Sequence, residues 1–277
     1  MTRMQGVRRT AGALVAVLLL AGCDDGGSST PPPEHTSAPT PPPSAAPPPP
    51  GPETGQCYTL TFKQAVAPTS KRKPRPCDQP HTSETYDVGD LDTVVDGHLV
   101  AVDSDRVQQQ VSQTCPEKLS AFVGGDLSDL RLSMIRPVWF TPTVRGSDRG
   151  ENWYRCDAVV VAGDNELAQL DSSLKGVLGK DAGRDTYAMC GTAAPDADDF
   201  ERVQCSSQHT WRAIAVVPFT PGPYPGIKAA EARGQTPCEN AGLDVADDPL
   251  QFDWGYEYPT ADQWAAGQTF GRCWAPD

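Results

Sequence analysis

The sequence is poor in basic residues and lacks the common catalytic motifs. Its 277 residues include 23 lysines and arginines against 36 aspartates and glutamates, which gives a formal net charge of −13. A nucleic-acid-binding protein needs a basic face, so this balance argues against a nucleic-acid partner. The serine-hydrolase elbow GxSxG, the phosphate-binding loop GxxxxGK(S/T) and the zinc-protease motif HExxH do not occur. We therefore expect a protein that is not an enzyme.

Long apolar runs are also scarce. The run TAGALVAVLLLAG at residues 10–22 is too short for an ordinary membrane span, and a basic, acid-free start precedes it. This pattern predicts a secretory signal peptide over residues 1–22. The ending LAGC, which closes with Cys23, resembles the lipobox of bacterial lipoproteins. It implies cleavage before Cys23 and attachment of diacylglycerol to the Cys23 thiol, with palmitate as the fatty acid. The alternative is an ordinary signal peptide with an unrelated cysteine.

The segment that follows is rich in proline, serine and glycine. Residues 24–55 contain no large apolar side chain, so they cannot bury enough surface to offset the entropy of ordering. We expect residues 23–55 to form a lipidated, disordered linker that its prolines keep extended. The predicted location is the extracytoplasmic face of the cell membrane, with the lipid anchor as the contact to the membrane.

Two pairs of segments in the rest of the chain are similar to one another. CDQPHTSETYDV (77–88) and CSSQHTWRAIAV (205–216) both read Cys-x3-His-Thr followed by a strand-like run. PTVRGSDRGENWYRC (142–156) and PTADQWAAGQTFGRC (259–273) share Pro-Thr, a glycine, an aromatic residue and an arginine at equal distances from the cysteine. This internal similarity predicts a tandem duplication.

Both copies show the same order of predicted elements, strand-strand-helix-strand-strand. We therefore expect an α+β fold with two tandem disulfide-stapled modules, residues 56–165 and 186–277, joined by a linker at 166–185. The expected strands are 56–62, 83–90, 130–140 and 153–162 in the first module, and 186–191, 210–219, 252–258 and 269–275 in the second. The expected helices are 104–123 and 227–246, and Pro116 is expected to kink or split the first.

Eight cysteines follow Cys23, four in each module. Exported chains meet an oxidising compartment, where disulfides persist. If both modules pair internally and alike, three patterns remain, and an outer–inner arrangement is the main alternative to the one we favour. The favoured pairs are Cys57–Cys77, Cys115–Cys156, Cys190–Cys205 and Cys238–Cys273. Cys-x3-His differs from the Cys-x2-Cys zinc knuckle, and each module has only one histidine in such a motif. We therefore expect no metal and no cofactor.

The repeated histidines, His81 and His209, are the first candidates for a functional site. A catalytic base needs a partner; Glu84 follows His81 by three positions, but Arg212 holds the equivalent place after His209. Residues three apart on a strand point to opposite faces, so His81 and Glu84 are not expected to converge. We therefore expect no catalytic residue, and a structural or binding role for both histidines.

The densest aromatic stretch is FDWGYEYPTADQW at residues 252–264. Exposed aromatic side chains often mark binding surfaces. Trp254 and Trp264 are therefore candidates for a surface that stacks on wall glycan, and burial in the core is the alternative.

Three motifs resemble a known family. They are GQCY ending at Tyr58, PCDQPH ending at His81 with the later Glu84, and WxxG ending at Gly267. In these motifs each half resembles the septum-formation domain family of high-GC Gram-positive (actinobacterial) bacteria, over residues 55–277. The departures from the family pattern are Gln208, Arg212 and Ser147. The resemblance implies an envelope protein with no established catalytic residues.

The leading hypothesis is a membrane-anchored, non-catalytic extracytoplasmic lipoprotein with a role in septum formation or cell-envelope organisation. A second hypothesis is a binding module for wall polymer or a partner protein, with its site at the interface between the modules. A third is a wall hydrolase that uses His81.

Overall fold

A computed structural model describes residues 47–277 of the chain. The predicted signal peptide, the predicted lipidation of Cys23 and most of the predicted linker at 23–55 lie outside the described residues. Within the described residues, no helix combines the length and the apolar character needed to cross a membrane.

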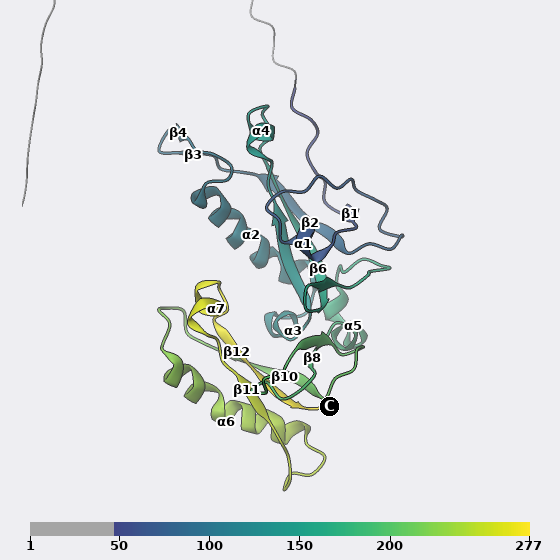
Figure 1. The fold of residues 1–277 in the computed structure, drawn as a ribbon, viewed down its shortest axis with the longest axis vertical. Helices are drawn as coiled ribbons and strands as arrows, with labels where there is room; N and C mark the ends of the chain where they lie inside the picture. The colour runs from purple at the N-terminus through teal and green to yellow at the C-terminus, as the bar shows by residue number, and fades with distance from the viewer. Residues whose placement is uncertain (1–46) are drawn as a thin grey trace, which may run out of the picture. The chain divides into compact units, whose positions relative to one another are not determined.

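The N-terminal half is built on an antiparallel sheet with the strand order β1-β2-β6-β5, and β7 also pairs with β6. Its strands are β1 Cys57–Tyr58, β2 Ser83–Asp90, β5 Ile135–Phe140, β6 Trp153–Gly163 and β7 Glu166–Leu167. Helix α2, Asp105–Val123, lies along this sheet (Figure 1). Every fourth residue of α2 from Val107 to Val123 is buried, which gives the helix one apolar stripe for packing.

The C-terminal half has a second antiparallel sheet, with the order β11-β12-β10-β8-β9. Its strands are β8 Met189–Gly191, β9 Arg202–Gln204, β10 Trp211–Pro218, β11 Gly255–Glu257 and β12 Phe270–Pro276. Helix α6, Ile227–Val245, packs on this sheet through small residues, including Gly234 and Gly242. A Cβ atom at Gly234 would lie 2.1 Å from the Tyr256 ring, so the close approach of helix and sheet requires glycine there.

Short elements connect the larger ones. They are α1 Phe62–Ala65, β3 Val94–Val95, β4 His98–Leu99, α3 Leu127–Arg131, α4 Val144–Ser147, the 3₁₀ helix η1 Val177–Gly179, α5 Asp181–Thr186 and α7 Ala261–Ala265. Helix α3 falls where the sequence predicts the start of a strand at 130–140. Asp126 and Asp129 form a capping box that starts this helix, so the strand begins only at Ile135.

The two sheets place corresponding strands in the same order. When β8, β10, β12 and β11 are set against β1, β2, β6 and β5, the neighbours agree. Both sheets also have a register shift at the same distance from the histidine, between Thr85 and Asp87 and between Ala213 and Ala215. Each long helix contains one proline, Pro116 or Pro237, and α2 continues through Pro116 rather than splitting. Helices and antiparallel sheets thus form a mixed α/β arrangement, in agreement with the expected class.

Four disulfides join the same cysteines that the sequence favours: Cys57–Cys77, Cys115–Cys156, Cys190–Cys205 and Cys238–Cys273. In each half one bond lies at the start of the sheet, between segments close in sequence. The other joins the long helix to the central strand β6 or β12, with Cα–Cα distances of 5.4 Å and 4.9 Å. Each disulfide of this second kind therefore ties a helix to its sheet.

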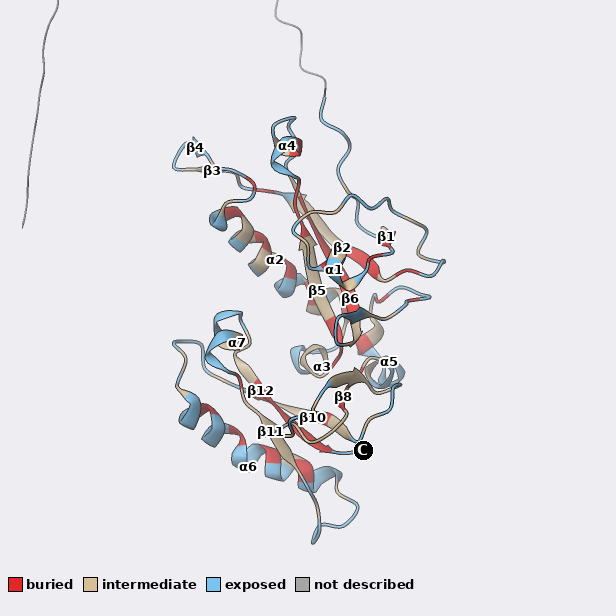
Figure 2. Cartoon of the chain, in the orientation of Figure 1, coloured by how far each residue is buried: buried red, intermediate tan, exposed pale blue. Residues whose placement is uncertain are grey.

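The segment expected to be a linker, 166–185, is packed against the N-terminal half. Leu174 and Leu178 are fully buried, and they belong to a hydrophobic cluster that also includes Ile135 from β5 and Trp274 from β12. Figure 2 shows in red the buried residues along α2, β6 and β12. The halves also meet through the backbone, where Met134 N–H donates to the Tyr187 carbonyl at 2.7 Å. One hydrophobic cluster therefore spans both sheets, and the segment 166–185 belongs to it rather than forming a spacer.

Candidate functional site

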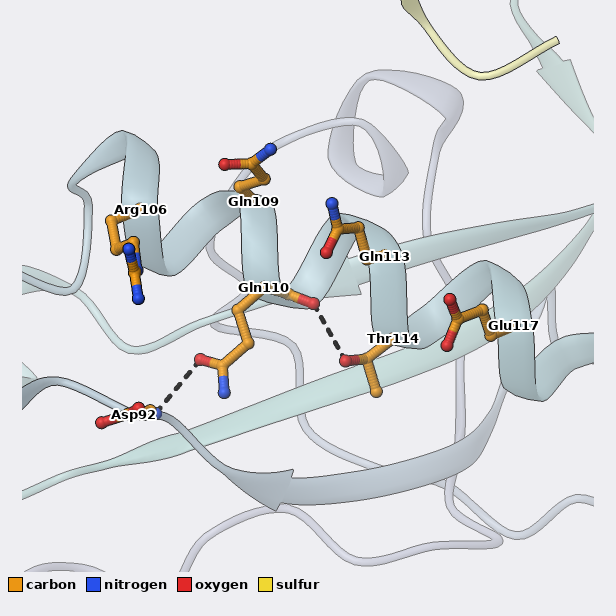
Figure 3. A pocket seen from close by; sticks show the side chains of 7 residues that line it. All are labelled: Asp92, Arg106, Gln109, Gln110, Gln113, Thr114 and Glu117. Atoms are coloured by element: carbon orange, nitrogen blue, oxygen red, sulfur yellow. Dashed lines mark hydrogen bonds between the residues drawn. The ribbon is translucent and has the colours of Figure 1, made fainter. Parts of the chain in front are cut away.

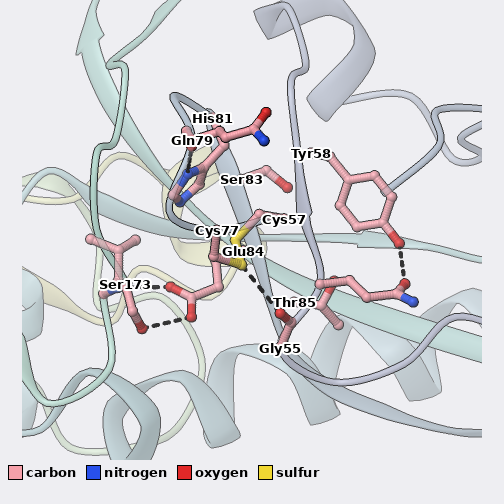
Figure 4. The surroundings of a disulfide bond; sticks show 12 residues. Gly55, Cys57, Tyr58, Cys77, Gln79, His81, Ser83, Glu84, Thr85 and Ser173 are labelled. Atoms are coloured by element: carbon pink, nitrogen blue, oxygen red, sulfur yellow. Dashed lines mark hydrogen bonds between the residues drawn. A yellow bond between two sulfur atoms is a disulfide. The ribbon is translucent and has the colours of Figure 1, made fainter. Parts of the chain in front are cut away.

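His81 lies immediately before β2 and is fully buried. Its Nδ1 lies 2.8 Å from the Gln79 carbonyl oxygen (Figure 4). Because a carbonyl only accepts, Nδ1 must carry the proton of this hydrogen bond. Within residues 47–277, Nε2 has no hydrogen-bond partner. The backbone of His81 exchanges two hydrogen bonds with Leu170, of 3.0 and 2.7 Å, which cover it with the packed segment.

Glu84 also forms hydrogen bonds to the segment 166–185 and does not pair with His81. Its two oxygens accept hydrogen bonds of 2.7 Å each, one from the Ser173 hydroxyl and one from the Leu174 N–H (Figure 4). The side chain is 5 % exposed. His81 and Glu84 therefore both hold the segment around 170–174, and both are buried.

His209 repeats half of this arrangement. Its Nδ1 lies 2.7 Å from the Ser207 carbonyl oxygen, the same two-residue step as in His81. Its Nε2 lies 3.4 Å from Asp277 at the C-terminus, and 19 % of the side chain is exposed. The two histidines are thus in separate halves, one buried and one near the surface.

One group of potential metal ligands comes together in the described part of the chain. Cys190 Sγ, His209 and Asp277 offer atoms within 4.8 Å of one another. Cys190 is bonded to Cys205, however, so it cannot supply a thiolate. Two remaining ligands fall short of the four that a structural zinc site uses.

Trp254 and Trp264 are partly buried and lie against different neighbours. Trp264 Nε1 donates to the Gly222 carbonyl at 3.0 Å, and its ring makes edge contacts with Phe219 and Tyr224. Trp254 packs at Gly242 of α6. Both rings therefore take part in packing, and only part of each is accessible.

A buried ion pair in the N-terminal sheet was missed by the sequence analysis. Asp157 accepts hydrogen bonds of 2.7 Å from the Ser83 and Thr85 hydroxyls, and Arg155 Nε lies 2.9 Å from it. Burial raises the pKa of Asp157, while Arg155 and the two hydroxyls oppose that shift. The Arg155 guanidinium lies 3.8 Å from the centroid of Tyr58, with a second aromatic ring 4.4 Å away. The signal available in the sequence was the charged pair inside WYRCDAVVVA.

The outer face of α2 borders a polar groove of about 410 Å³. Figure 3 shows the amide side chains of Gln109, Gln110 and Gln113 along this face. Gln110 Oε1 accepts from the Asp92 N–H at 3.1 Å, which joins the helix to the loop opposite. Gln109 and Gln113 are exposed and four residues apart, so their amides lie one turn apart on the same face.

A model of the septum formation family matches residues 54–273. The chain belongs to the septum formation family. The match runs through both sheets in one span and confirms the resemblance noted in the sequence. No curated protein and no solved structure matches the chain. Membership of the septum formation family indicates a role in cell division or in the cell envelope.

Proposed function

We propose that this protein is a lipid-anchored envelope protein on the extracytoplasmic face of the cell membrane, with a non-catalytic role in septum formation or envelope organisation. The family match over residues 54–273 carries this proposal. The LAGC sequence ending at Cys23 supports the anchor, and four disulfides suit an oxidising compartment. The wall and the division proteins are the partners that such a role implies.

The non-catalytic part rests on how the candidate residues are used. His81 is buried beneath Leu170, and Glu84 is fully engaged by Ser173 and Leu174. A general base must reach the proton that it removes, so neither residue is placed for a hydrolase. These contacts support a structural role for both.

The two halves are proposed to be tandem copies of one module. The shared strand order, the equivalent register shifts and the equivalent disulfides support a duplication. Unrelated sheets would not be expected to agree in all three features, together with the repeated Cys-x3-His-Thr sequence.

The septal role is tested by deletion and by localisation of a tagged full-length protein. We expect enrichment at division sites and altered septum spacing on deletion.

The anchor is tested by palmitate labelling, which Cys23→Ser should abolish while releasing the protein from the membrane. Uniform distribution with normal septa would contradict the septal role, and unchanged labelling of Cys23→Ser would contradict the anchor.

A second candidate function, binding of a polar wall polymer, is supported by the groove along α2. Its exposed amides can donate and accept hydrogen bonds, as hydroxyl-rich chains require. The test is retention of the protein on purified wall. Gln109→Ala with Gln113→Ala should reduce retention, whereas Gln235→Ala on the exposed face of α6 should not. Equal retention of all variants would exclude this groove.

A further inference from the structure

A cavity of about 320 Å³ lies where the two sheets meet, and three arginines line it. Each comes from a different strand: Arg136 from β5, Arg202 from β9 and Arg272 from β12. The N-terminal and C-terminal halves both contribute, so the cavity exists only in the assembled pair of sheets. Such a gathering of positive charge is unusual in a chain with a net charge of −13.

Counter-charge around these arginines is in short supply. Within residues 47–277, Glu257 is the one carboxylate bonded to them: Arg202 Nη2 donates to its Oε1, and Arg272 Nη1 lies 3.5 Å from the same oxygen. Arg136 Nη1 donates to two neutral carbonyls, those of Ser133 at 2.8 Å and Ile135 at 2.7 Å. These carbonyls satisfy hydrogen bonds but do not neutralise charge.

The remaining acids at the cavity are Asp164 and Glu201, and both are exposed. Water screens exposed charges, so these two offset little of the buried positive charge. In agreement with this, burial and then the nearby Arg272 and Arg202 lower the pKa of Arg136 to about 9. The cavity is therefore a place where a further negative charge would be stabilised.

The arginines are held in place and retain free donors. The Arg202 guanidinium lies 5.5 Å from the Phe200 ring centroid, and the Arg272 guanidinium lies 4.9 Å from that of Phe270. Arg202 Nε is buried and has no hydrogen-bond partner in the described part of the chain. The amide side chains of Gln263 and Gln268 complete the polar wall. Aromatic contacts of this kind keep guanidinium groups ordered before a ligand arrives.

We propose that this inter-sheet cavity, the arginine pocket, binds an oxyanion, either a carboxylate or a phosphate group. The planar fork of a guanidinium matches both groups, and charge-assisted hydrogen bonds of this type are among the strongest in proteins. The volume suits a small ligand or the charged end of a larger one. The proposal goes beyond the septal role and depends on neither the lipid anchor nor the groove along α2.

The test is titration of the purified full chain with inorganic phosphate and with citrate, at an ionic strength matched with sodium chloride. We expect saturable binding of at least one probe by calorimetry and a ligand-dependent rise in melting temperature. Arg202→Gln should weaken binding at least tenfold, because it removes one charge-assisted guanidinium–oxyanion contact. Arg136→Gln should also weaken it. Arg145→Gln removes an exposed arginine elsewhere and should leave binding unchanged.

Arg202 is only partly buried, so its variant should stay folded even if Arg136→Gln does not. Circular dichroism without ligand verifies this. Absence of binding for both probes would overturn the proposal. So would equal binding by wild type and Arg202→Gln, or a loss caused instead by Lys71→Gln, which changes an exposed lysine of the KRK loop at residues 71–73, outside the arginine pocket. Because the readout is binding of a defined ion, its failure is distinct from any failure of the septal role.

Discussion

The two sheets share a scaffold but fill equivalent positions with opposite chemistry. Strands β6 and β12 both contain the dipeptide Arg-Cys. The residue after it is Asp157 in β6 and Trp274 in β12. On the neighbouring strand, Ser83 and Thr85 bond to Asp157, whereas Trp211 and Ala213 occupy the equivalent places in the second sheet. A charged, hydroxyl-lined interior in one half therefore corresponds to an apolar one in the other.

This exchange changes the surroundings of the arginine that precedes the cysteine in each half, Arg155 or Arg272. Arg155 is enclosed between two aromatic rings and paired with Asp157 on its own strand. Trp274 instead packs edge-on against Phe200, and the counter-charge for Arg272 comes from Glu257 on β11. Arg155 therefore has a carboxylate of its own, while Arg272 shares one carboxylate with Arg202. The difference teaches that one scaffold can use the same arginine for stability or leave it available for a ligand.

The largest expected effect is a difference in stability loss between removing the carboxylate partner of Arg155 and removing that of Arg272. Asp157→Asn removes a buried charge without changing shape, and it leaves Arg155 uncompensated. We expect a loss of about 3–5 kcal/mol in the free energy of unfolding, measured by denaturant titration. Glu257→Gln is the matched change in the other half. Its loss should be smaller, because the side chain of its partner Arg202 is 37 % exposed and water can hydrate the charge left behind, whereas that of Arg155 is only 4 % exposed. Equal losses would mean that the two halves are energetically alike.

The disulfides should show where the halves are the same. Cys115 and Cys156 are 41 residues apart, and Cys238 and Cys273 are 35 apart. Loop-closure entropy depends only on the logarithm of this length, so the two bonds should contribute nearly equally. Replacing either pair by serine should cost about 2–4 kcal/mol. A large difference between the two double variants, measured in the same unfolding experiment, would contradict equivalence.

A smaller effect is expected at the contact between Glu84 and the 170–174 segment. Glu84→Gln puts an amide nitrogen next to either the Leu174 N–H or the Ser173 hydroxyl. With the nitrogen at Ser173, the exposed hydroxyl accepts from it, so both contacts persist but with a neutral amide in place of a charged carboxylate. Losing the charge from both hydrogen bonds should cost about 1–3 kcal/mol. Hydrogen exchange should quicken first at the amides of Leu170 and Leu174. If exchange is unchanged there and quickens elsewhere, Glu84 does not anchor this segment.

Local sequence patterns predicted the two long helices and the long strands because these depend on periodicity. The disulfide pairs were favoured among three patterns, which the assumption of like pairing within each half had left. Contacts between distant segments could not be predicted in the same way. The anchoring of Leu174 by Glu84 spans 90 residues, and Arg272 Nε reaches the Arg131 carbonyl across 141. The arginine pocket needs strands from both halves, and no spacing in the chain indicates which strands meet.

Boundaries were also lost where local capping overrides a strand-like composition. The capping box of Asp126 and Asp129 turns the start of the expected strand at 130–140 into helix α3. The segment 166–185 has the small and polar residues of a linker, but three of its leucines are buried. In that segment the tertiary contact, not the composition, decides the structure.

The smallest expected effect lies at Arg212, the equivalent of Glu84. Arg212 donates to Asp185 at 2.8 Å and lies 3.7 Å from Asp277, and about a third of its side chain is exposed. Exposed ion pairs contribute little because water competes and salt screens them, so Arg212→Gln should cost about 0.2–1 kcal/mol. Raising the salt concentration in the unfolding experiment should shrink even this loss. A cost as large as that of Glu84→Gln, unaffected by salt, would show that the position is structural in both halves. The expected gap between the two variants instead reflects one scaffold position used in two ways: buried anchoring in the first sheet and a surface ion pair in the second.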